Sequence, residues 1–267
     1  MKRRGTLSHR SIVVAMACGL APVFGAGVAR AAQPTDQGTS PAAQPAGKAP
    51  SPESLFQRHI EAIGGMDKIH EHKTRRISGN VEFPQVGQQV FLEMYQEAPN
   101  RLYLRVDSGL GSVTETVYDG EVAWMKIGSE PAKKIPQDQV APIIDTAAFY
   151  GEADYAARYT SMQTLPQERF GEKMAWPVKV ESKTGRSARV LFDPETGLIL
   201  GTDGEAAPGV MQRVFFQDYK EIGGVRAPQT LVQITGDNTA ILRYRSFEVN
   251  VKPDRDYFAR PEGVSGD

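Results

Sequence analysis

Hydrophobic positions recur at every second residue along most of the chain between residues 74 and 251. Ile77, Val81 and Phe83 alternate with polar residues, and further short runs with the same period follow. This period is typical of strands that bury one face. Short turns join the runs, and Asp119-Gly120 between two alternating runs is the clearest hairpin signal. The pattern predicts a mainly β (α+β) protein of about ten strands.

Strands that are joined by tight turns pair antiparallel, because parallel pairing needs long crossover connections. About ten strands are also too many for one flat, twisted sheet. We therefore expect a curled antiparallel sheet that forms a barrel or a half-barrel.

Two segments have a helical period instead. Ser51 and Pro52 are suited to begin a helix, and Gly64-Gly65 ends it. Its apolar stripe comprises Leu55, Phe56, His59, Ile60 and Ile63. In the second segment, 139–150, the apolar residues are Val140, Ile143, Ile144, Ala147 and Ala148. We expect both helices to cover the concave face of the sheet, either as fixed core or with the 139–150 helix as a mobile lid.

The N-terminus predicts export. Residues 1–31 combine a basic start, a short apolar stretch and the small residues Ala29 and Ala31, which is the pattern of a cleaved signal peptide. The apolar stretch is too short and too rich in Gly and Pro for a membrane span. We therefore expect a periplasmic protein without a transmembrane segment in the mature chain. Twin-arginine export through Arg3-Arg4, and a lipid anchor on Cys18, remain open alternatives.

Residues 32–51 are rich in Pro, Ala, Gln, Gly and Ser. They lack the aromatic and β-branched residues that build a core, so they predict a disordered linker. The remaining residues, 52–267, are enough for one domain with a sizeable core.

Charge and cysteine content exclude several classes of partner and site. Five of the 31 Lys and Arg residues and none of the 32 acids lie in 1–31, which leaves 26 basic residues and a net charge of −6. Nucleic acids and anionic membrane surfaces attract basic proteins, so neither is an expected partner. Cys18 is the only cysteine, so the mature chain has neither a disulfide nor a thiolate site.

Catalytic chemistry is not indicated. The sequence lacks a nucleophile elbow, a phosphate-binding glycine loop and a dinucleotide fingerprint. His70 and His72 are two residues apart, which directs them away from each other on a helix, and His59 lies on an apolar stripe. We therefore expect no catalytic residues, no metal site and no cofactor, although a carboxylate pair that meets only in the fold remains open.

Several turn and strand motifs between residues 54 and 264 are typical of one family. They are His59-Ile60-Glu61-Ala62-Ile63-Gly64-Gly65, Ala98-Pro99-Asn100-Arg101, Tyr118-Asp119-Gly120-Glu121-Val122-Ala123-Trp124, Asp193-Pro194-Glu195-Thr196-Gly197-Leu198, Tyr219-Lys220-Glu221-Ile222-Gly223-Gly224-Val225-Arg226-Ala227-Pro228, Phe247-Glu248-Val249-Asn250 and Phe258-Ala259-Arg260-Pro261. With these motifs the chain resembles the outer membrane lipoprotein-sorting proteins of the LolA/LolB type.

The resemblance implies an unclosed half-barrel with helices over a hydrophobic cavity. It also implies relatives that carry lipoprotein acyl chains or related lipids across the periplasm. Our candidates for residues that line such a cavity are Leu92, Met94, Leu102, Leu104, Val106, Trp124, Ile143, Ile144 and Phe149. For each of them, ordinary core packing is the alternative.

Two functions from different classes follow from these observations. The first is an exported envelope protein that binds a lipid, a lipoprotein acyl chain or another hydrophobic ligand. The second is a non-enzymatic interaction module that docks onto another envelope protein. A binding protein needs an apolar cavity of about 300 Å³ or more, whereas a docking module needs none.

Overall fold

The computed structural model describes residues 49–109, 111–207 and 209–259. The signal peptide expected over 1–31 lies outside the described residues, and so does the linker expected over 32–51 apart from its last three residues.

Helices and strands follow one another as the alternating pattern predicts, with the helices near the start and in the middle of the chain. The helices are α2 (Pro52–Ala62), α3 (Met66–Glu71), α4 (Ala141–Ala147) and α5 (Tyr155–Arg158), with the short 3-10 helices η1 (Gln137–Gln139) and η2 (Gly151–Asp154). The strands are β1 (Thr74–Phe83), β2 (Gln88–Glu97), β3 (Arg101–Asp107), β4 (Val113–Tyr118), β5 (Ala123–Ile127), β6 (Lys133–Lys134), β7 (Tyr159–Thr164), β8 (Glu168–Phe170), β9 (Lys173–Ser182), β10 (Ser187–Phe192), β11 (Ile199–Ala207), β12 (Val210–Gln217), β13 (Lys220–Ile222), β14 (Val225–Ala227), β15 (Thr230–Thr235) and β16 (Asn238–Val249).

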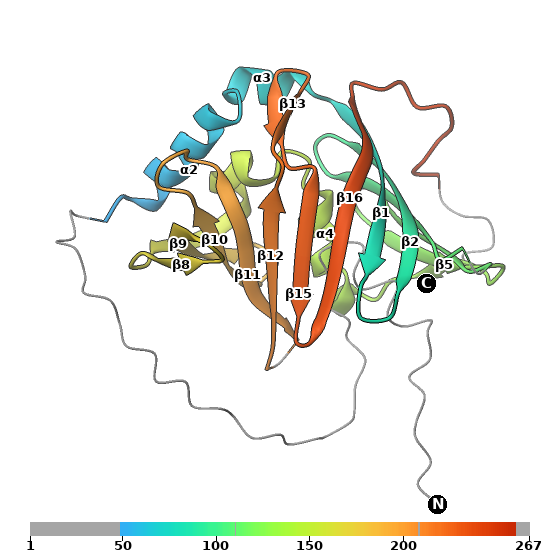
Figure 1. Cartoon of the computed structure of the whole chain (residues 1–267). Coiled ribbons are helices and arrows are strands. Elements are labelled where there is room, and N and C mark those ends of the chain that lie inside the picture. The colour runs from blue at the N-terminus through green and yellow to red at the C-terminus, as the bar shows by residue number, and fades with distance from the viewer. Residues whose placement is uncertain (1–48, 110, 208, 260–267) are drawn as a thin grey trace, which may run out of the picture.

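Fourteen of these strands form one antiparallel sheet (Figure 1). Its order is β6-β5-β4-β3-β2-β1-β16-β15-β12-β11-β10-β9-β7, with β8 paired to β9, and β13 and β14 form a separate hairpin. Within the described residues β6 and β7 are the two ends of this order, so the sheet is curled but not closed. The expected curled antiparallel sheet is confirmed. The sheet has more than the expected ten strands because short strands such as β6 and β8 carry too few residues to show a period of two.

The expected helices are present, with different ends. Ser51 caps α2 by accepting a hydrogen bond from the backbone N of Ser54 at 3.2 Å. The segment expected to be one helix over 139–150 contains the last residue of η1 and the seven-residue α4. Helix α5, which follows η2, was not expected, because four residues are too few to show a helical period.

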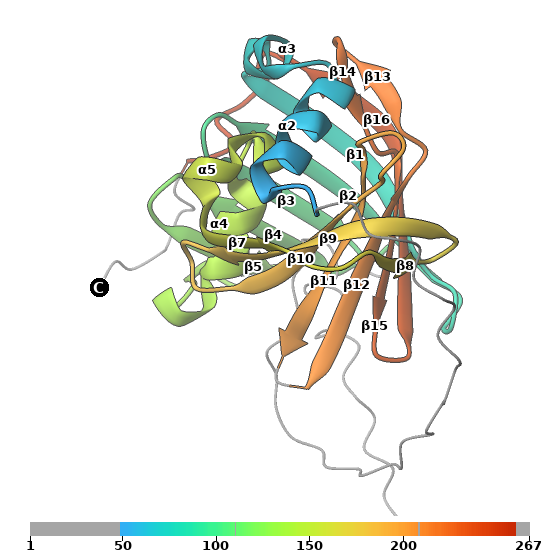
Figure 2. The ribbon, with the colours of Figure 1, turned by 90° about the vertical axis from the view of Figure 1, so that its left-hand side faces the viewer.

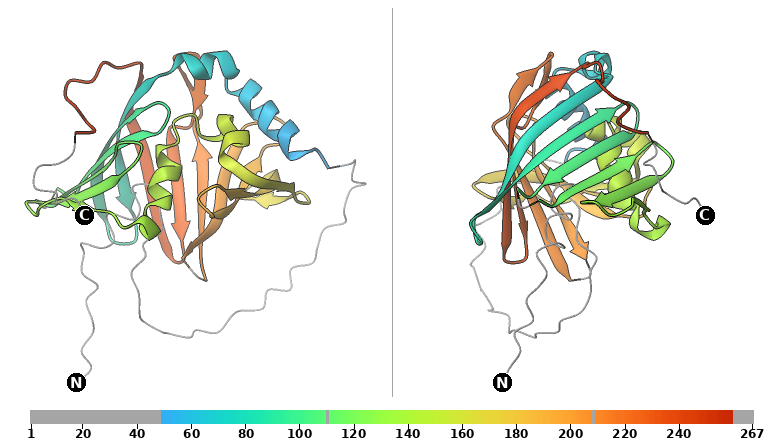
Figure 3. Two further views of the ribbon diagram at one scale, coloured as in Figure 1. Left: turned by 180° about the vertical axis from the view of Figure 1, so that it is seen from behind. Right: turned by 90° about the vertical axis from the view of Figure 1, so that its right-hand side faces the viewer.

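The helices cover one face of the sheet, which we call the inner face (Figures 2 and 3). The inner face carries two buried apolar cores. The α4 core joins β1–β5 to α4, and its buried residues are Val81, Phe83, Val90, Leu92, Leu102, Leu104, Val106, Tyr118, Ala123, Ile135, Val140, Ile143, Ala147 and Ala240. The α2 core joins β9–β11 to α2, and its buried residues are Leu55, Phe56, Val178, Val180, Val190, Phe192 and Ile199.

Gly79 lies at a register shift where β1 pairs with β16. A Cβ atom at this position would lie 2.4 Å from the carbonyl oxygen of Arg243. We expect Gly79→Ala to lower the free energy of unfolding by about 1–3 kcal/mol, because the backbone of the adjacent strand has to move. Urea denaturation measures this change. Asn80→Ala, one residue along, should cost less than about 0.5 kcal/mol, and an equal cost for both variants would contradict the close approach at Gly79.

Candidate ligand-binding face

Apolar side chains connect the two cores across the middle of the inner face. Phe216 of β12 lies directly opposite Leu231 of β15, and Leu231 lies opposite Leu242 of β16. Phe216 packs against the α2 core, and Leu242 packs against the α4 core. All three side chains are half-buried. This central row (Phe216, Leu231 and Leu242) is therefore apolar surface that the cores and helices leave partly open.

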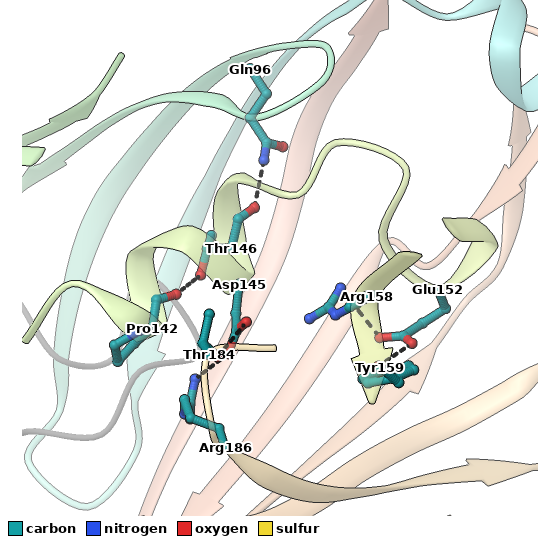
Figure 4. A network of polar contacts seen from close by, with 9 residues as sticks. All are labelled: Gln96, Pro142, Asp145, Thr146, Glu152, Arg158, Tyr159, Thr184 and Arg186. Atoms are coloured by element: carbon teal, nitrogen blue, oxygen red, sulfur yellow. Dashed lines mark hydrogen bonds and ion pairs between the residues drawn. The ribbon is translucent and has the colours of Figure 1, made fainter. Parts of the chain in front are cut away.

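Helix α4 is attached to strands β1 and β2 by a chain of two hydrogen bonds, of which Figure 4 shows the contact between Gln96 and Thr146. The Nε of Arg75 donates to Gln96 Oε1 at 2.6 Å, and Gln96 Nε2 donates to the carbonyl oxygen of Thr146 in α4 at 2.7 Å. The Arg75 guanidinium also lies 4.6 Å from the centre of the Phe149 ring. Burial lowers the pKa of Arg75 to about 10, so the group is still a cation at neutral pH.

The same helix is attached to the other half of the sheet through Asp145. This carboxylate accepts hydrogen bonds from Thr184 Oγ1 and from the guanidinium of Arg186, both at 3.1 Å, in and after the turn between β9 and β10. Figure 4 shows both contacts beside the α4 backbone. Since Gln96 and Arg186 belong to different halves of the sheet, α4 bridges them.

A third polar group lies beside α4, on η2, α5 and β7. The Tyr159 hydroxyl donates to Glu152, and Arg158 lies 3.6 Å from the other Glu152 oxygen (Figure 4). Burial and the neighbouring carboxylate raise the pKa of Tyr159, so its hydroxyl remains a donor at neutral pH.

Two small cavities adjoin these polar groups. One, of about 180 Å³, is lined on its polar side by Asp145, Glu152, Arg158 and Arg186. The other, of about 230 Å³, lies between α4, α5 and the β9–β10 turn. Asp145 and Arg158 line both cavities, which places these two side chains between them.

Most of the residues predicted to line a cavity are brought together in the α4 core. Leu92, Leu102, Leu104, Val106 and Ile143 are buried there and pack against one another. Met94 and Ile144 are half-buried and pack against the same core. These residues therefore form the packed layer between α4 and the sheet.

Trp124 does not lie with them. It follows Ala123, which faces the α4 core, so the alternation of the strand directs Trp124 to the outer face. There it packs with Tyr95, Tyr103, Val117, Tyr257 and Phe258, and it lines an outer cavity of about 590 Å³. A period of two does not say which of two adjacent apolar residues faces the core.

Phe149 lies beyond the end of α4, and its backbone N donates to the carbonyl oxygen of Pro99 at 2.9 Å. It is buried against Arg75 and Tyr150 and lines the 230 Å³ cavity. Phe149 is therefore near the predicted face but at its edge.

The sequence analysis did not select the central row or Arg75, Arg158 and Arg186. The sequence predicted that the three residues of the row lie in strands, but nothing in it indicated that their side chains would be only half-buried. The arginines come from a strand (Arg75), a short helix (Arg158) and the connection between β9 and β10 (Arg186), positions that look solvent-exposed in the sequence. Only the fold brings them beside α4.

The histidines in the described part of the chain contact backbone carbonyl groups and one exposed carboxylate. The ring of His59 is buried, and its Nδ1 lies 3.3 Å from the carbonyl oxygen of Gly197. His72 Nε2 lies 2.9 Å from the carbonyl oxygen of Gly223, and His70 lies 3.8 Å from Asp154. Among the described residues, no group of three or more His, Cys, Asp or Glu side chains is arranged to hold a metal ion.

No helix within residues 49–109, 111–207 and 209–259 is long and apolar enough to cross a membrane. No protein-family model and no curated protein matches the sequence.

Solved structures match the fold. A DUF1329 family protein from Desulfovibrio piger is 11% identical with a TM-score of 0.56, and the match covers 79% of this chain and 98% of that chain. A LolA superfamily protein from Nitrosomonas europaea has the same identity, TM-score and coverage of this chain, and 99% of its own length is covered. A domain from Vibrio parahaemolyticus, described as an outer membrane lipoprotein-sorting protein, is 10% identical with a TM-score of 0.54, over 77% of this chain and 95% of that chain. The protein therefore has a LolA-like fold, in which a curled antiparallel sheet stays open around its covering helices.

Proposed function

We propose that this protein is an exported envelope protein that binds a hydrophobic ligand, such as a lipid or a lipoprotein acyl chain, on the inner face of its sheet. The observation that carries the proposal is the central row of half-buried apolar side chains between two packed cores. The two cavities beside α4, of about 180 and 230 Å³, are each smaller than the roughly 300 Å³ expected of a closed ligand pocket, so the proposed site is the partly open surface of the row and not a closed cavity. The pattern of residues 1–31 supports export to the periplasm. Binding and transfer of the ligand, without chemistry, is the proposed role.

An acyl chain is the ligand that such a surface stabilises best. Each methylene group removed from water contributes about 0.8 kcal/mol. The central row runs across three strands, from Phe216 to Leu242, and a straight chain can contact every side chain of such a row. The LolA-like fold supports the same ligand class, because two of the structures that share it are described as LolA and lipoprotein-sorting proteins.

Helix α4 is the element whose position controls how much of the inner face is open. Its contacts with the sheet combine the α4 core with the polar attachments of Gln96 and Asp145. We propose that a bulky ligand displaces α4 by breaking these polar contacts, while a single acyl chain enters along the central row.

Replacing Leu231 by aspartate tests the proposal. A carboxylate on the central row should weaken acyl-chain binding by about tenfold or more, because a charge is costly to bury. Uptake of a fluorescent fatty acid and native mass spectrometry of protein purified without detergent measure the effect. Ile234→Asp is the matched control, since Ile234 is on the same strand, faces the other side of the sheet and is 38% exposed.

Circular dichroism establishes that Leu231→Asp is folded, and the milder Leu231→Ala should give a smaller loss of binding. Co-purified lipid in the wild-type protein, lost in Leu231→Asp and kept in Ile234→Asp, supports the proposal. A lipid-free wild-type protein that takes up no fatty acid contradicts it and favours the interaction module.

A further inference from the structure

Arg158 has unused hydrogen-bonding capacity in a mostly buried position. It is the last residue of α5, and its side chain is 21% exposed. Its Nε is buried and has no hydrogen-bond partner among the described residues. The nearest carboxylate oxygen, from Glu152, is 3.6 Å away, which is beyond normal hydrogen-bond length. The planar guanidinium therefore retains donors for a further acceptor.

The carboxylates around Arg158 are already engaged by other donors. Asp145 accepts from Thr184 and Arg186, and Glu152 accepts from the Tyr159 hydroxyl. These two acids and two arginines make the lining of the 180 Å³ cavity neutral overall. Because the lining has no net positive charge, a headgroup with several negative charges would be repelled, and a singly charged one has to be held by the free donors of Arg158.

The cavity beside Arg158 continues into apolar surface. Its lining also includes Val180, Ala188 and Val190 of the inner face, with Thr202 of β11. Thr202 lies directly opposite Val214 of β12, and Val214 is two residues from Phe216 in the central row. A volume of about 180 Å³ is several times the roughly 30 Å³ that one water molecule occupies. It therefore has room for a carboxylate or a phosphate group.

We propose that the ligand of the inner face is an amphiphile with a singly charged acidic headgroup, which binds to Arg158 in this cavity while its acyl chain lies along the central row. This inference rests on the proposed function and adds the headgroup class. A guanidinium presents paired N–H donors that match a carboxylate or a phosphate, and partial burial of the site strengthens such bonds. Arg186 also lines the cavity, but its charge is paired with Asp145.

The experiment compares two lipids with the same myristoyl chain, lysophosphatidylglycerol and monoacylglycerol, both below their micelle concentrations. Glycerol phosphate is the anion without a tail. Isothermal titration calorimetry gives the affinity of each for the full-length protein, for Arg158→Gln and for Arg169→Gln. Arg169 is exposed on β8, so its variant makes the same change of charge away from the cavity.

We expect the wild-type protein and Arg169→Gln to bind the lysophospholipid about tenfold or more tightly than the monoacylglycerol, which is a typical gain from charge-assisted hydrogen bonds. Arg158→Gln should remove this preference and keep its affinity for monoacylglycerol, which also shows that the variant is folded. Arg158→Lys, which keeps the charge without the paired donors, should retain part of the preference.

Two results would overturn the headgroup inference and leave apolar binding intact. One is equal affinity for the two lipids in the wild-type protein, and the other is an unchanged preference in Arg158→Gln. Binding of glycerol phosphate as tight as that of the lysophospholipid would identify a site for a free anion and would also overturn it. If neither lipid binds to the wild-type protein, the proposed function itself fails.

Discussion

Phe56→Ala should lower the free energy of unfolding by about 3–5 kcal/mol, the range for removal of a buried aromatic ring. Phe56 is 0% exposed. Its ring stacks on Tyr155 at 4.8 Å and meets the edge of Phe192 at 4.9 Å. These contacts join α2 to α5 and to β10, so the alanine variant leaves a cavity between three elements that cannot close without moving α2.

Thermal and urea denaturation measure this loss. For a domain of about 200 residues, each kcal/mol corresponds to roughly 2–4 °C in the melting temperature. Gln57→Ala is the control on the same helix, because Gln57 is exposed and its replacement should change stability by less than about 0.5 kcal/mol. Equal melting temperatures for the two variants would show that α2 is not packed onto the sheet in solution.

Stability should also fall as the pH is lowered from about 6.5 to about 4, because His59 is buried as a neutral ring. Burial lowers the pKa of His59 from 6.5 to about 4. Between these values the unfolded chain binds a proton at His59 and the folded protein does not, so protonation favours unfolding. The stabilisation is complete above pH 6.5, and the full shift corresponds to about 3 kcal/mol lost by pH 4.

The measurement is the free energy of unfolding from urea titrations at several pH values in this window. His59→Gln should flatten the dependence on pH, whatever its effect on absolute stability, since the amide does not titrate. Gln57→Ala is the control, because Gln57 is exposed on the same helix and carries no ionisable group, so the slope should be unchanged. A wild-type slope that persists in His59→Gln would assign the pH dependence to other groups.

Protonation of Asp193 also lowers the stability of the folded protein, at lower pH than protonation of His59. Hydrogen bonds from Lys173 and from the backbone of Glu195 and Thr196 outweigh burial and lower the pKa of Asp193 below its ordinary value of 3.8. Its contribution to stability is present above pH 3.8 and is lost as the pH falls through the folded-state pKa. The His59 effect is therefore measured above pH 4, before this carboxylate titrates.

Local chemistry accounts for the elements that the sequence predicted well. The Asp119 side chain accepts hydrogen bonds from the backbone N of Glu121 and of Val122, both at 2.8 Å, in the turn between β4 and β5. Ser51 caps α2 in the same local way. Contacts of this kind join residues two or three positions apart, so both partners lie in one short segment that a sequence pattern can identify.

The site depended on contacts between distant parts of the chain. Gln96 and Thr146 are 50 residues apart, and Asp145 and Arg186 are 41 apart. The central row likewise requires β12, β15 and β16 to be neighbours in the correct register. No local pattern encodes such pairings, because each strand would satisfy its period of two beside several other strands.

Trp124 shows most clearly what the sequence determined and what the tertiary structure decided. Neighbouring residues of a strand, such as Ala123 and Trp124, lie on opposite faces of the sheet, and the sequence predicted an antiparallel sheet covered by helices, with Trp124 as a cavity-lining candidate. Which face becomes the inner one was decided by α4 packing over Ala123 and by Tyr257 and Phe258 packing over Trp124. The physical reason is that strand formation follows from side chains near one another in the sequence, whereas the covering of each face and the partly open central row follow from segments that meet only when the whole sheet has assembled.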